Sequence, residues 1–276
     1  MKTNRRIVIA LAMLLIGVQA FAQEQTVRAF SHRGGRMEND ENTLEAFIIS
    51  RDLGYHGYET DIRMTSDGVL VVTHDETLDR TTNGSGVVEE STWADLQKLD
   101  TKGGHKLIRL EQLMEFLEGQ TNLYVEFELK TKPVNLYPEE RLEEYCDKLW
   151  DIVMANEPED GDYLFTSSDQ RGLKYLKEKH PEGKYLVIFN EGVNDKTIAV
   201  AKALGIPRIG CMMEGTTRKY VDKAKKEGLT VSLWPTHKIE DFVLGIYLGS
   251  DYLCTDIPEE TMRFMAEKMP WVEVVY

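Results

Sequence analysis

The sequence is poor in cysteine and in positive charge. Three cysteines in 276 residues, Cys146, Cys211 and Cys254, are widely spaced, so we expect core residues with at most one bridge, not a disulfide framework. Lysine and arginine number 33 against 47 aspartates and glutamates, a formal net charge of −14. This balance disfavours nucleic acid and anionic membranes as partners. No linker rich in Pro, Gly or Ser divides the chain, and its length fits one large domain or two small ones.

The first 22 residues have the pattern of a secretory signal peptide. A basic start precedes the apolar run Ile7–Val18, and Ala20-Phe21-Ala22 matches the small-x-small cleavage pattern. The run is short for a membrane span, so cleavage is favoured over an uncleaved anchor. Cleavage would leave residues 23–276 with a net charge of −17, because three positive charges are removed from a chain at −14. We therefore predict export, to the periplasm or the medium, without stable membrane insertion after cleavage.

Short apolar runs alternate with amphipathic segments through the rest of the chain. The predicted strands are Val27–Ser31, Gly57–Asp61, Leu123–Lys130, Tyr163–Thr166, Tyr185–Phe189, Arg208–Met212, Thr230–Trp234 and Asp251–Thr255. The predicted helices are Asn42–Leu53, Glu139–Ala155, Asp169–Lys179, Asn194–Leu204, Thr217–Glu227, Ile239–Leu248 and Pro258–Lys268, the first capped by Asn42. Such alternation implies parallel strands with right-handed crossovers. The predicted fold is an α/β (β/α)₈ TIM barrel, which typically takes about 250 residues.

An open doubly wound sheet is the alternative fold. It would place a Gly-rich dinucleotide turn after the first strand, but His32-Arg33-Gly34-Gly35 lacks that spacing. One segment interrupts the barrel rhythm, because Val69–Thr73 is predicted to pair back on the second strand through a turn at Ser66-Asp67-Gly68. A small insertion, about residues 75–118, then separates the second and third barrel strands. Its stretch Arg80–Gly86 is either a plain turn or an edge of the site.

Two carboxylates lie on one face of the second predicted strand. Glu59 and Asp61 are two residues apart, so their side chains point the same way. Neighbouring buried carboxylates repel each other, and a divalent cation is the usual reason for such a pair. His74, thirteen residues after Asp61, offers proton transfer near neutral pH.

Other strands bring polar side chains to the same end of the predicted barrel, where the active sites of such barrels lie. His32 and Arg33 end the first strand, Trp234 ends the seventh and Asp256 follows the eighth. The alternation of the third strand turns its Glu126, Glu128 and Lys130 inward. Two histidines, an arginine and paired acids predict metal-assisted chemistry on an anionic group.

Six motifs occur in an order and spacing that resemble the glycerophosphodiester phosphodiesterase family. They are His32-Arg33-Gly34, Glu41-Asn42-Thr43, Glu59-x-Asp61, His74-Asp75 with Leu78-x-Arg80-Thr81-Thr82-x-Gly84, Glu128-x-Lys130 and Thr255-Asp256-x-Pro258. The resemblance runs from about Arg28 to Pro258, nearly the whole of residues 23–276. It implies a metal-dependent hydrolase that converts glycerophosphodiesters to sn-glycerol 3-phosphate and an alcohol, through a cyclic phosphate that water opens.

The resemblance also implies roles for the site residues. One divalent cation, Ca²⁺ or Mg²⁺, would bind to Glu59, Asp61 and Glu128; His32 and His74 would act as general acid and base; Arg33, Lys130 and Trp234 would bind the substrate. An oxygen-only ligand set suits a hard cation. The planar guanidinium of Arg33 suits two phosphate oxygens. Glu126 is expected one layer deeper, either with a structural role or orienting Lys130 or Arg33.

The chain departs from the family pattern at two places. Asp40 stands where a proline usually precedes the Glu41 motif, and Trp234-Pro235-Thr236-His237 replaces the more common Trp-Thr-x-Asn. The second change leaves the head group of the substrate open. The remaining histidines, His56, His105, His180 and His237, have no convergent setting and are expected to be surface or local hydrogen-bonding residues.

Two rival functions remain open from the sequence. A lysophospholipase D-like or phosphoinositide-phospholipase-C-like enzyme would need an apolar, membrane-facing rim, which the acidic chain and the polar stretch Arg80–Gly86 disfavour. A non-catalytic barrel that binds glycerol phosphates would not need both His32 and His74.

Overall fold

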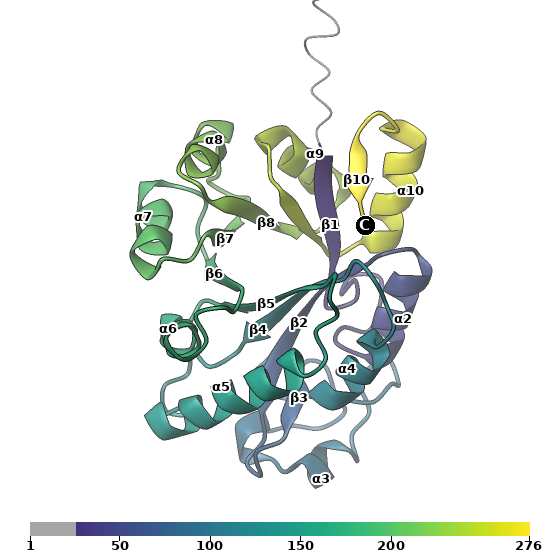
Figure 1. Ribbon diagram of the computed structural model, residues 1–276. Helices are drawn as coiled ribbons and strands as arrows, with labels where there is room; N and C mark the ends of the chain where they lie inside the picture. The colour runs from purple at the N-terminus through teal and green to yellow at the C-terminus, as the bar shows by residue number, and fades with distance from the viewer. Residues whose placement is uncertain (1–25) are drawn as a thin grey trace, which may run out of the picture.

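Eight parallel strands close into a barrel in the computed structural model, which describes residues 26–276 (Figure 1). They are β1 (Thr26–His32), β2 (Gly57–Met64), β4 (Tyr124–Leu129), β5 (Asp162–Ser167), β6 (Tyr185–Phe189), β7 (Arg208–Met212), β8 (Thr230–Thr236) and β9 (Tyr252–Thr255). The ring closes because β1 pairs with both β9 and β2. The predicted (β/α)₈ barrel is thus confirmed, whereas the predicted signal peptide, residues 1–22, lies outside the described residues.

Helices cover the outside of the barrel. They are α2 (Leu44–Asp52), α4 (Leu110–Leu117), α5 (Glu139–Met154), α6 (Gln170–Lys179), α7 (Asp195–Leu204), α8 (Arg218–Lys226), α9 (Ile239–Leu248) and α10 (Pro258–Lys268). In α5 the buried residues Leu142, Cys146 and Leu149 recur at helical spacing and join one hydrophobic core with Phe127 of β4. The outward-facing residues of the strands therefore form the main core, which leaves the inward-facing ones free to build a site. No helix within residues 26–276 has the length and apolarity to cross a membrane.

The start of the first helix differs from the prediction. Thr43, not Asn42, caps α2, because the Thr43 hydroxyl accepts a hydrogen bond from the Ala46 amide. Asn42 has a left-handed φ of +59° and donates through Nδ2 to Asp61 Oδ2 at 2.8 Å. The residue predicted to cap a helix is instead part of the site, since the turn after β1 directs its side chain into the barrel mouth.

The inserted segment lies on one flank of the barrel. The strand β3 (Leu70–Val72), which pairs antiparallel with β2 as predicted, leads into it, and it continues through η1 (Val88–Glu90) and α3 (Trp93–Leu96). A small separate core holds it together, made of Val71, Leu78, Val88, Leu96 and Leu107. The helix α4, which the sequence interpretation left inside the insertion, completes the crossover from β2 to β4, with its apolar side buried.

Two further details complete the fold. A short strand β10 (Glu273–Val275), not predicted, pairs parallel with the start of β1 outside the barrel, so the C-terminus lies beside β1 (Figure 1). Cys146, Cys211 and Cys254 are all free and buried, as expected for core residues.

Candidate active site

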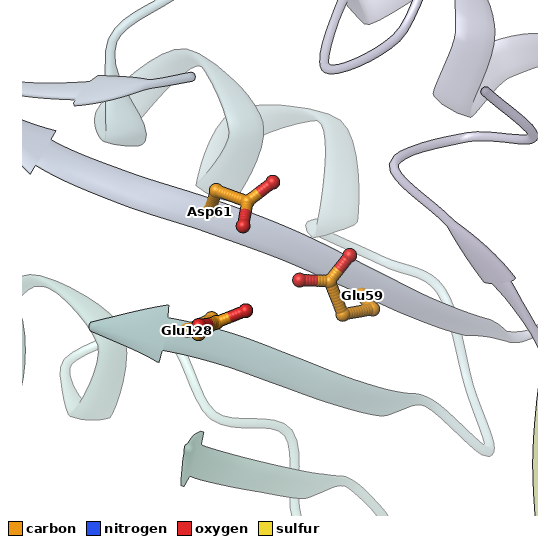
Figure 2. Close-up of side chains that lie close together, drawn as sticks. All are labelled: Glu59, Asp61 and Glu128. Carbon is orange, nitrogen blue, oxygen red and sulfur yellow. The ribbon is translucent and has the colours of Figure 1, made fainter. Parts of the chain in front are cut away.

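Three carboxylates from two neighbouring strands converge at the barrel mouth. Glu59 and Asp61 project from β2 and Glu128 from β4, and Figure 2 shows the three carboxyl groups turned toward one shared space. One ligand oxygen from each can be chosen so that all lie within 4.8 Å of one another. The parallel pairing of β2 with β4 causes this, because Asp61 is in register with Glu128. The structure thus brings together the three residues predicted to bind the cation.

This acidic cluster has the properties expected of a cation site. Both carboxylate oxygens of Glu59 and Oδ1 of Asp61 are buried and have no hydrogen-bond partner among the described residues. Burial and the adjacent Asp61 carboxylate raise the pKa of Glu59 well above its usual range. Burial also acts to raise the pKa of Asp61, but Arg33 and Lys130 outweigh it, so that pKa falls far below its usual range. A bound cation would offset the unfavourable charge on Glu59 and use the oxygens that accept no hydrogen bond.

Two cationic side chains flank the acids. Arg33 Nε lies 3.0 Å from Asp61 Oδ2, and Lys130 Nζ lies 3.0 Å from Glu128 Oε1. Arg33 has a left-handed φ of +55°, which is uncommon for a residue with a Cβ and typical of functional positions. The turn then needs glycine, because a Cβ on Gly34 would lie 2.6 Å from the Cβ of Ala46. The chain accepts this local strain where it places a guanidinium over the acidic cluster.

His32 is held between two carboxylates. Its Nδ1 lies 2.5 Å from Asp256 Oδ1, and its Nε2 lies 3.5 Å from Glu59 Oε2. Burial and the Arg33 charge lower the pKa of His32, although Asp256 acts in the opposite direction. Burial likewise opposes ionisation of Asp256, but His32 and Arg36 together outweigh it through hydrogen bonds and charge, and the pKa of Asp256 falls to about 2. The ionised Asp256 fixes the orientation of the His32 ring and directs Nε2 toward the acidic cluster.

His74 lines the same cavity as His32 and the acidic cluster. Its Nδ1 lies 2.6 Å from Asp75 Oδ1, and its backbone carbonyl accepts a hydrogen bond from Arg63 Nε at 2.9 Å. Its side chain is about one-third exposed, in contrast to the buried His32. Each histidine therefore binds a carboxylate through Nδ1 and has Nε2 available for proton transfer.

A cavity of about 600 Å³ opens between two different walls. The charged wall consists of His32, Arg33, Glu59, Glu128 and Lys130, and the apolar wall consists of Leu186, Ile188, Gly210 and Trp234. Glycine at position 210 keeps the apolar wall open, because a Cβ there would lie 2.9 Å from Leu186 Cδ2. The indole N–H of Trp234 has no hydrogen-bond partner among the described residues. The predicted catalytic, phosphate-binding and apolar residues thus meet around one cavity.

This arrangement fits hydrolysis of a phosphate ester. The site combines an oxygen-ligand cluster for a hard cation with two cationic side chains for phosphate oxygens and two histidines, His32 and His74, for proton transfer. The family model described as "Glycerophosphoryl diester phosphodiesterase family" matches residues 32–260. The chain belongs to this family. Its matched span begins at His32 and includes every site residue predicted from the sequence.

Two named relatives match over almost their whole length. A glycerophosphodiester phosphodiesterase of Caldanaerobacter subterraneus subsp. tengcongensis is 32% identical over 241 residues, which cover 85% of this chain and 96% of the relative. A glycerophosphodiester phosphodiesterase of Bacillus altitudinis is 34% identical over 253 residues, covering 87% and 98%. These relatives support family membership at the level of the full barrel.

Solved structures agree on the fold. A putative glycerophosphoryl diester phosphodiesterase of Silicibacter pomeroyi superposes with a TM-score of 0.81 at 23% identity, covering 90% of this chain and 95% of the other. An Oleispira antarctica phosphodiesterase, solved with its product sn-glycerol-3-phosphate, gives a TM-score of 0.79 at 21% identity, covering 87% and 97%. The barrel of this family member is therefore the one expected for the family.

Several polar residues have different settings from those expected. Among the described residues no hydrogen bond or ion pair joins Glu126 to Lys130 or Arg33; its carboxylate instead accepts a hydrogen bond from the Tyr124 hydroxyl at 2.5 Å, which fits the structural role. Glu126, Glu128 and Lys130 are successive inward-facing positions. Glu126 therefore lies two such positions deeper in the barrel than Lys130, too far for the expected contact. His237, predicted to be a surface or local hydrogen-bonding residue, bonds to Asp256 beside the site.

The sequence interpretation assigned no role to the carboxylates that hold the histidines. Asp75 was quoted only as part of a motif, and Asp256 only as a motif residue and as one of the polar residues at the mouth of the predicted barrel, yet each binds the Nδ1 of a histidine. The position of Asp256 after the last barrel strand indicated that it lies near the site, but not that it binds His32. Asp75 could have been found from its position next to His74.

Proposed function

We propose that the chain hydrolyses glycerophosphodiesters to sn-glycerol 3-phosphate and an alcohol. The observation that carries the proposal is the acidic cluster Glu59, Asp61 and Glu128 lying beside two histidines, each with its Nδ1 on a carboxylate. The names of the relatives and the product of the Oleispira enzyme support the substrate class. The reaction would occur in the cavity between the charged and apolar walls.

In this proposal Glu59, Asp61 and Glu128 hold one divalent cation, Ca²⁺ or Mg²⁺. When bound, such a cation neutralises charge that develops on phosphoryl oxygens and lowers the pKa of a coordinated hydroxyl or water. Arg33 and Lys130 bind the remaining phosphate oxygens from the same side. The ion pairs that these two residues make with Asp61 and Glu128 keep them in place before substrate arrives.

His32 and His74 divide the proton transfers. One histidine removes the proton from the attacking hydroxyl, and the other protonates the departing alcohol oxygen. Asp256 and Asp75 fix the two rings, so that Nε2 is the reacting nitrogen in both cases. Each well-placed histidine contributes about 10²–10⁴-fold in rate. Trp234 supplies an apolar face and one free N–H donor for the glycerol part.

We also propose export through the predicted signal peptide, to the periplasm or the medium. Its support is the basic start, apolar run and Ala20-Phe21-Ala22 pattern. Fractionation of expressing cells, followed by N-terminal sequencing, tests this part. A product that begins at Gln23 is expected, and an intact N-terminus in the cytoplasmic fraction would contradict it.

A panel of glycerophosphodiesters tests the activity. Choline, ethanolamine, inositol and glycerol members would be assayed with a chelator and after readdition of Ca²⁺ or Mg²⁺, with glycerol 3-phosphate detected by a coupled dehydrogenase. Cation-dependent release is expected for at least one member, and Asp61→Asn serves as the inactive control. Lysophosphatidylcholine is the competing substrate. Turnover of that lipid alone, or of no compound at all, would overturn the proposal.

A further inference from the structure

Arg80, in the inserted segment, contacts two carboxylates at the mouth of the cavity. Its Nη1 and Nη2 donate to the two oxygens of Glu41 at 2.7 Å each. Its Nε and Nη2 donate to the two oxygens of Asp75, at 2.5 and 3.1 Å. One guanidinium therefore makes two paired contacts at once, which its planar fork of donors allows.

Each of the two carboxylates also binds a site residue: Glu41 binds Arg33, and Asp75 binds His74. Glu41 accepts a hydrogen bond from Arg33 Nη1 at 3.0 Å, and Asp75 binds His74 Nδ1 at 2.6 Å. A continuous series of contacts thus runs from Arg33 through Glu41, Arg80 and Asp75 to His74. Arg33 is independently fixed by Asp61, so this end is the firm anchor and His74 is the end that needs support.

The backbone around Arg80 is well held by the insertion. Leu78 is buried in the separate core of the insertion, and its amide donates to the Gly86 carbonyl. The hydroxyl of Thr82 donates to the Leu78 carbonyl at 2.8 Å. These contacts fix the backbone on both sides of Arg80. Its half-exposed side chain can therefore hold Asp75 and Glu41 in defined positions.

A single ion pair at an exposed position would not be expected to affect the site. The Arg80 side chain is 47% exposed, and isolated exposed pairs contribute little to stability. Ion pairs in which an arginine makes two bidentate contacts within a network contribute more. In such pairs the planar geometry of the guanidinium acts together with its charge. The effect of Arg80 should therefore appear in the placement of His74 more than in the stability of the fold.

We propose that Arg80 is a positioning residue, which fixes Asp75 and through it the His74 ring, with Glu41 as its second anchor. The inserted segment then completes the site instead of only covering it. This inference rests on the proposed function, since it assigns the effect to proton transfer by His74 during diester hydrolysis. It goes further in making activity depend on a residue that touches no reacting atom.

Steady-state kinetics of Arg80→Met and Arg80→Lys test the geometry. We expect kcat to fall about 10–100-fold in both variants, the range seen for residues that orient a functional side chain, while KM changes by less than about threefold. The lysine variant keeps the charge, but one ammonium group cannot make both paired contacts. Full rescue by lysine would mean that charge alone matters and would overturn the proposal.

A double-mutant cycle tests the route. If Arg80 acts through Asp75, the double variant Asp75→Asn/Arg80→Met should have nearly the kcat of Asp75→Asn alone. Losses that multiply would show that Arg80 acts elsewhere, and the proposal would fail.

Thr101→Val is the matched control. Thr101 belongs to a second anchor of the insertion, in which its hydroxyl and the His105 ring both bind Asp40. The substitution loosens the insertion without touching the contacts of Arg80, so kcat should stay within about twofold of wild type. An equal loss of kcat in Thr101→Val and Arg80→Met would show that any loosening of the insertion lowers activity, and would contradict the proposal.

One readout does not require turnover and separates the two proposals. In protein with isotope-labelled histidine, NMR should show an Nδ1 proton of His74 that is protected from exchange with solvent. We expect this signal in wild type and in Thr101→Val, but not in Arg80→Met. If wild type hydrolysed no diester while this pattern held, the proposed function would fail and the positioning role would stand. An unchanged His74 signal in Arg80→Met would overturn the positioning role.

Discussion

The charged and apolar walls of the cavity are built on the same scaffold but have opposite energetics. In the charged wall, burial of Glu59 is unfavourable and is tolerated for the sake of a site. In the apolar wall, Leu186 is 2% exposed and joins a small core inside the barrel with Phe30 and Leu164. One wall therefore supplies chemistry at some cost in stability, and the other supplies stability and shape. Substitutions in the two walls should separate activity from stability.

The largest expected effect is that of Glu59→Gln in the charged wall. Loss of one cation ligand should lower kcat/KM on the order of 10⁴-fold, since the metal supplies several kcal/mol and each 1.36 kcal/mol is tenfold. The unfolding free energy at neutral pH should not fall, because the variant removes a carboxylate whose ionisation is opposed by burial and Asp61. Calorimetry of cation binding, kinetics and urea unfolding measure the three quantities. A clear loss of stability in Glu59→Gln with cation binding retained would show that the charged wall does not differ from the apolar wall in the way described.

His74→Ala should lower kcat by about 10²–10⁴-fold, because it removes one proton-transfer group. Its cation affinity should match that of wild type, because His74 is not among the three ligand candidates. His56→Ala, at an exposed position away from the cavity, is the matched control and should keep wild-type kcat. A drop in kcat below tenfold for His74→Ala would remove this histidine from the mechanism.

Leu186→Ala tests the apolar wall. The cavity it leaves should lower the unfolding free energy by about 2–5 kcal/mol, as for other buried leucines. Because Leu186 makes no polar contact with the charged wall, kcat should fall less than about tenfold. Denaturant unfolding and kinetics on the same preparation check both values. A loss of activity that exceeded the loss of stability would show that the walls are not separable.

Glu126→Gln should give the smallest effect, visible only as a dependence on pH. Burial raises the pKa of Glu126 to about 7 in the folded protein, above its value in the unfolded chain. The protonated form therefore favours folding, and stability declines as pH rises from about 4 to about 7. The variant should match wild type near pH 4 and be the more stable of the two near pH 8, because it lacks the group whose ionisation burial opposes. A stability difference that is constant with pH would contradict this.

The fold could be predicted from local pattern because each barrel unit carries its own signal. Alternation along β4 already separated Glu128 and Lys130 from outward Val125 and Phe127, and the structure agrees. The predicted helix Asn194–Leu204 agrees with α7, and Gly205, which follows it, has the left-handed φ of +61° typical of a residue that ends a helix. Contacts between distant segments were predicted less well. Asn42 had a plausible local role as a cap, but its bond to Asp61 depends on how two strands meet.

Local patterns were enough to predict the barrel, the family motifs and the residue types of the site. Periodicity and motif spacing are properties of neighbouring residues, so a one-dimensional pattern carries them. Three features required the folded chain: which carboxylate binds which histidine, that Arg80 joins Glu41 to Asp75, and that one wall of the cavity is apolar. Those relations depend on strand register and on the path of the insertion, which bring together residues as far apart as His32 and Asp256. Side-chain partners across such distances are fixed by packing of the whole barrel, not by any local pattern.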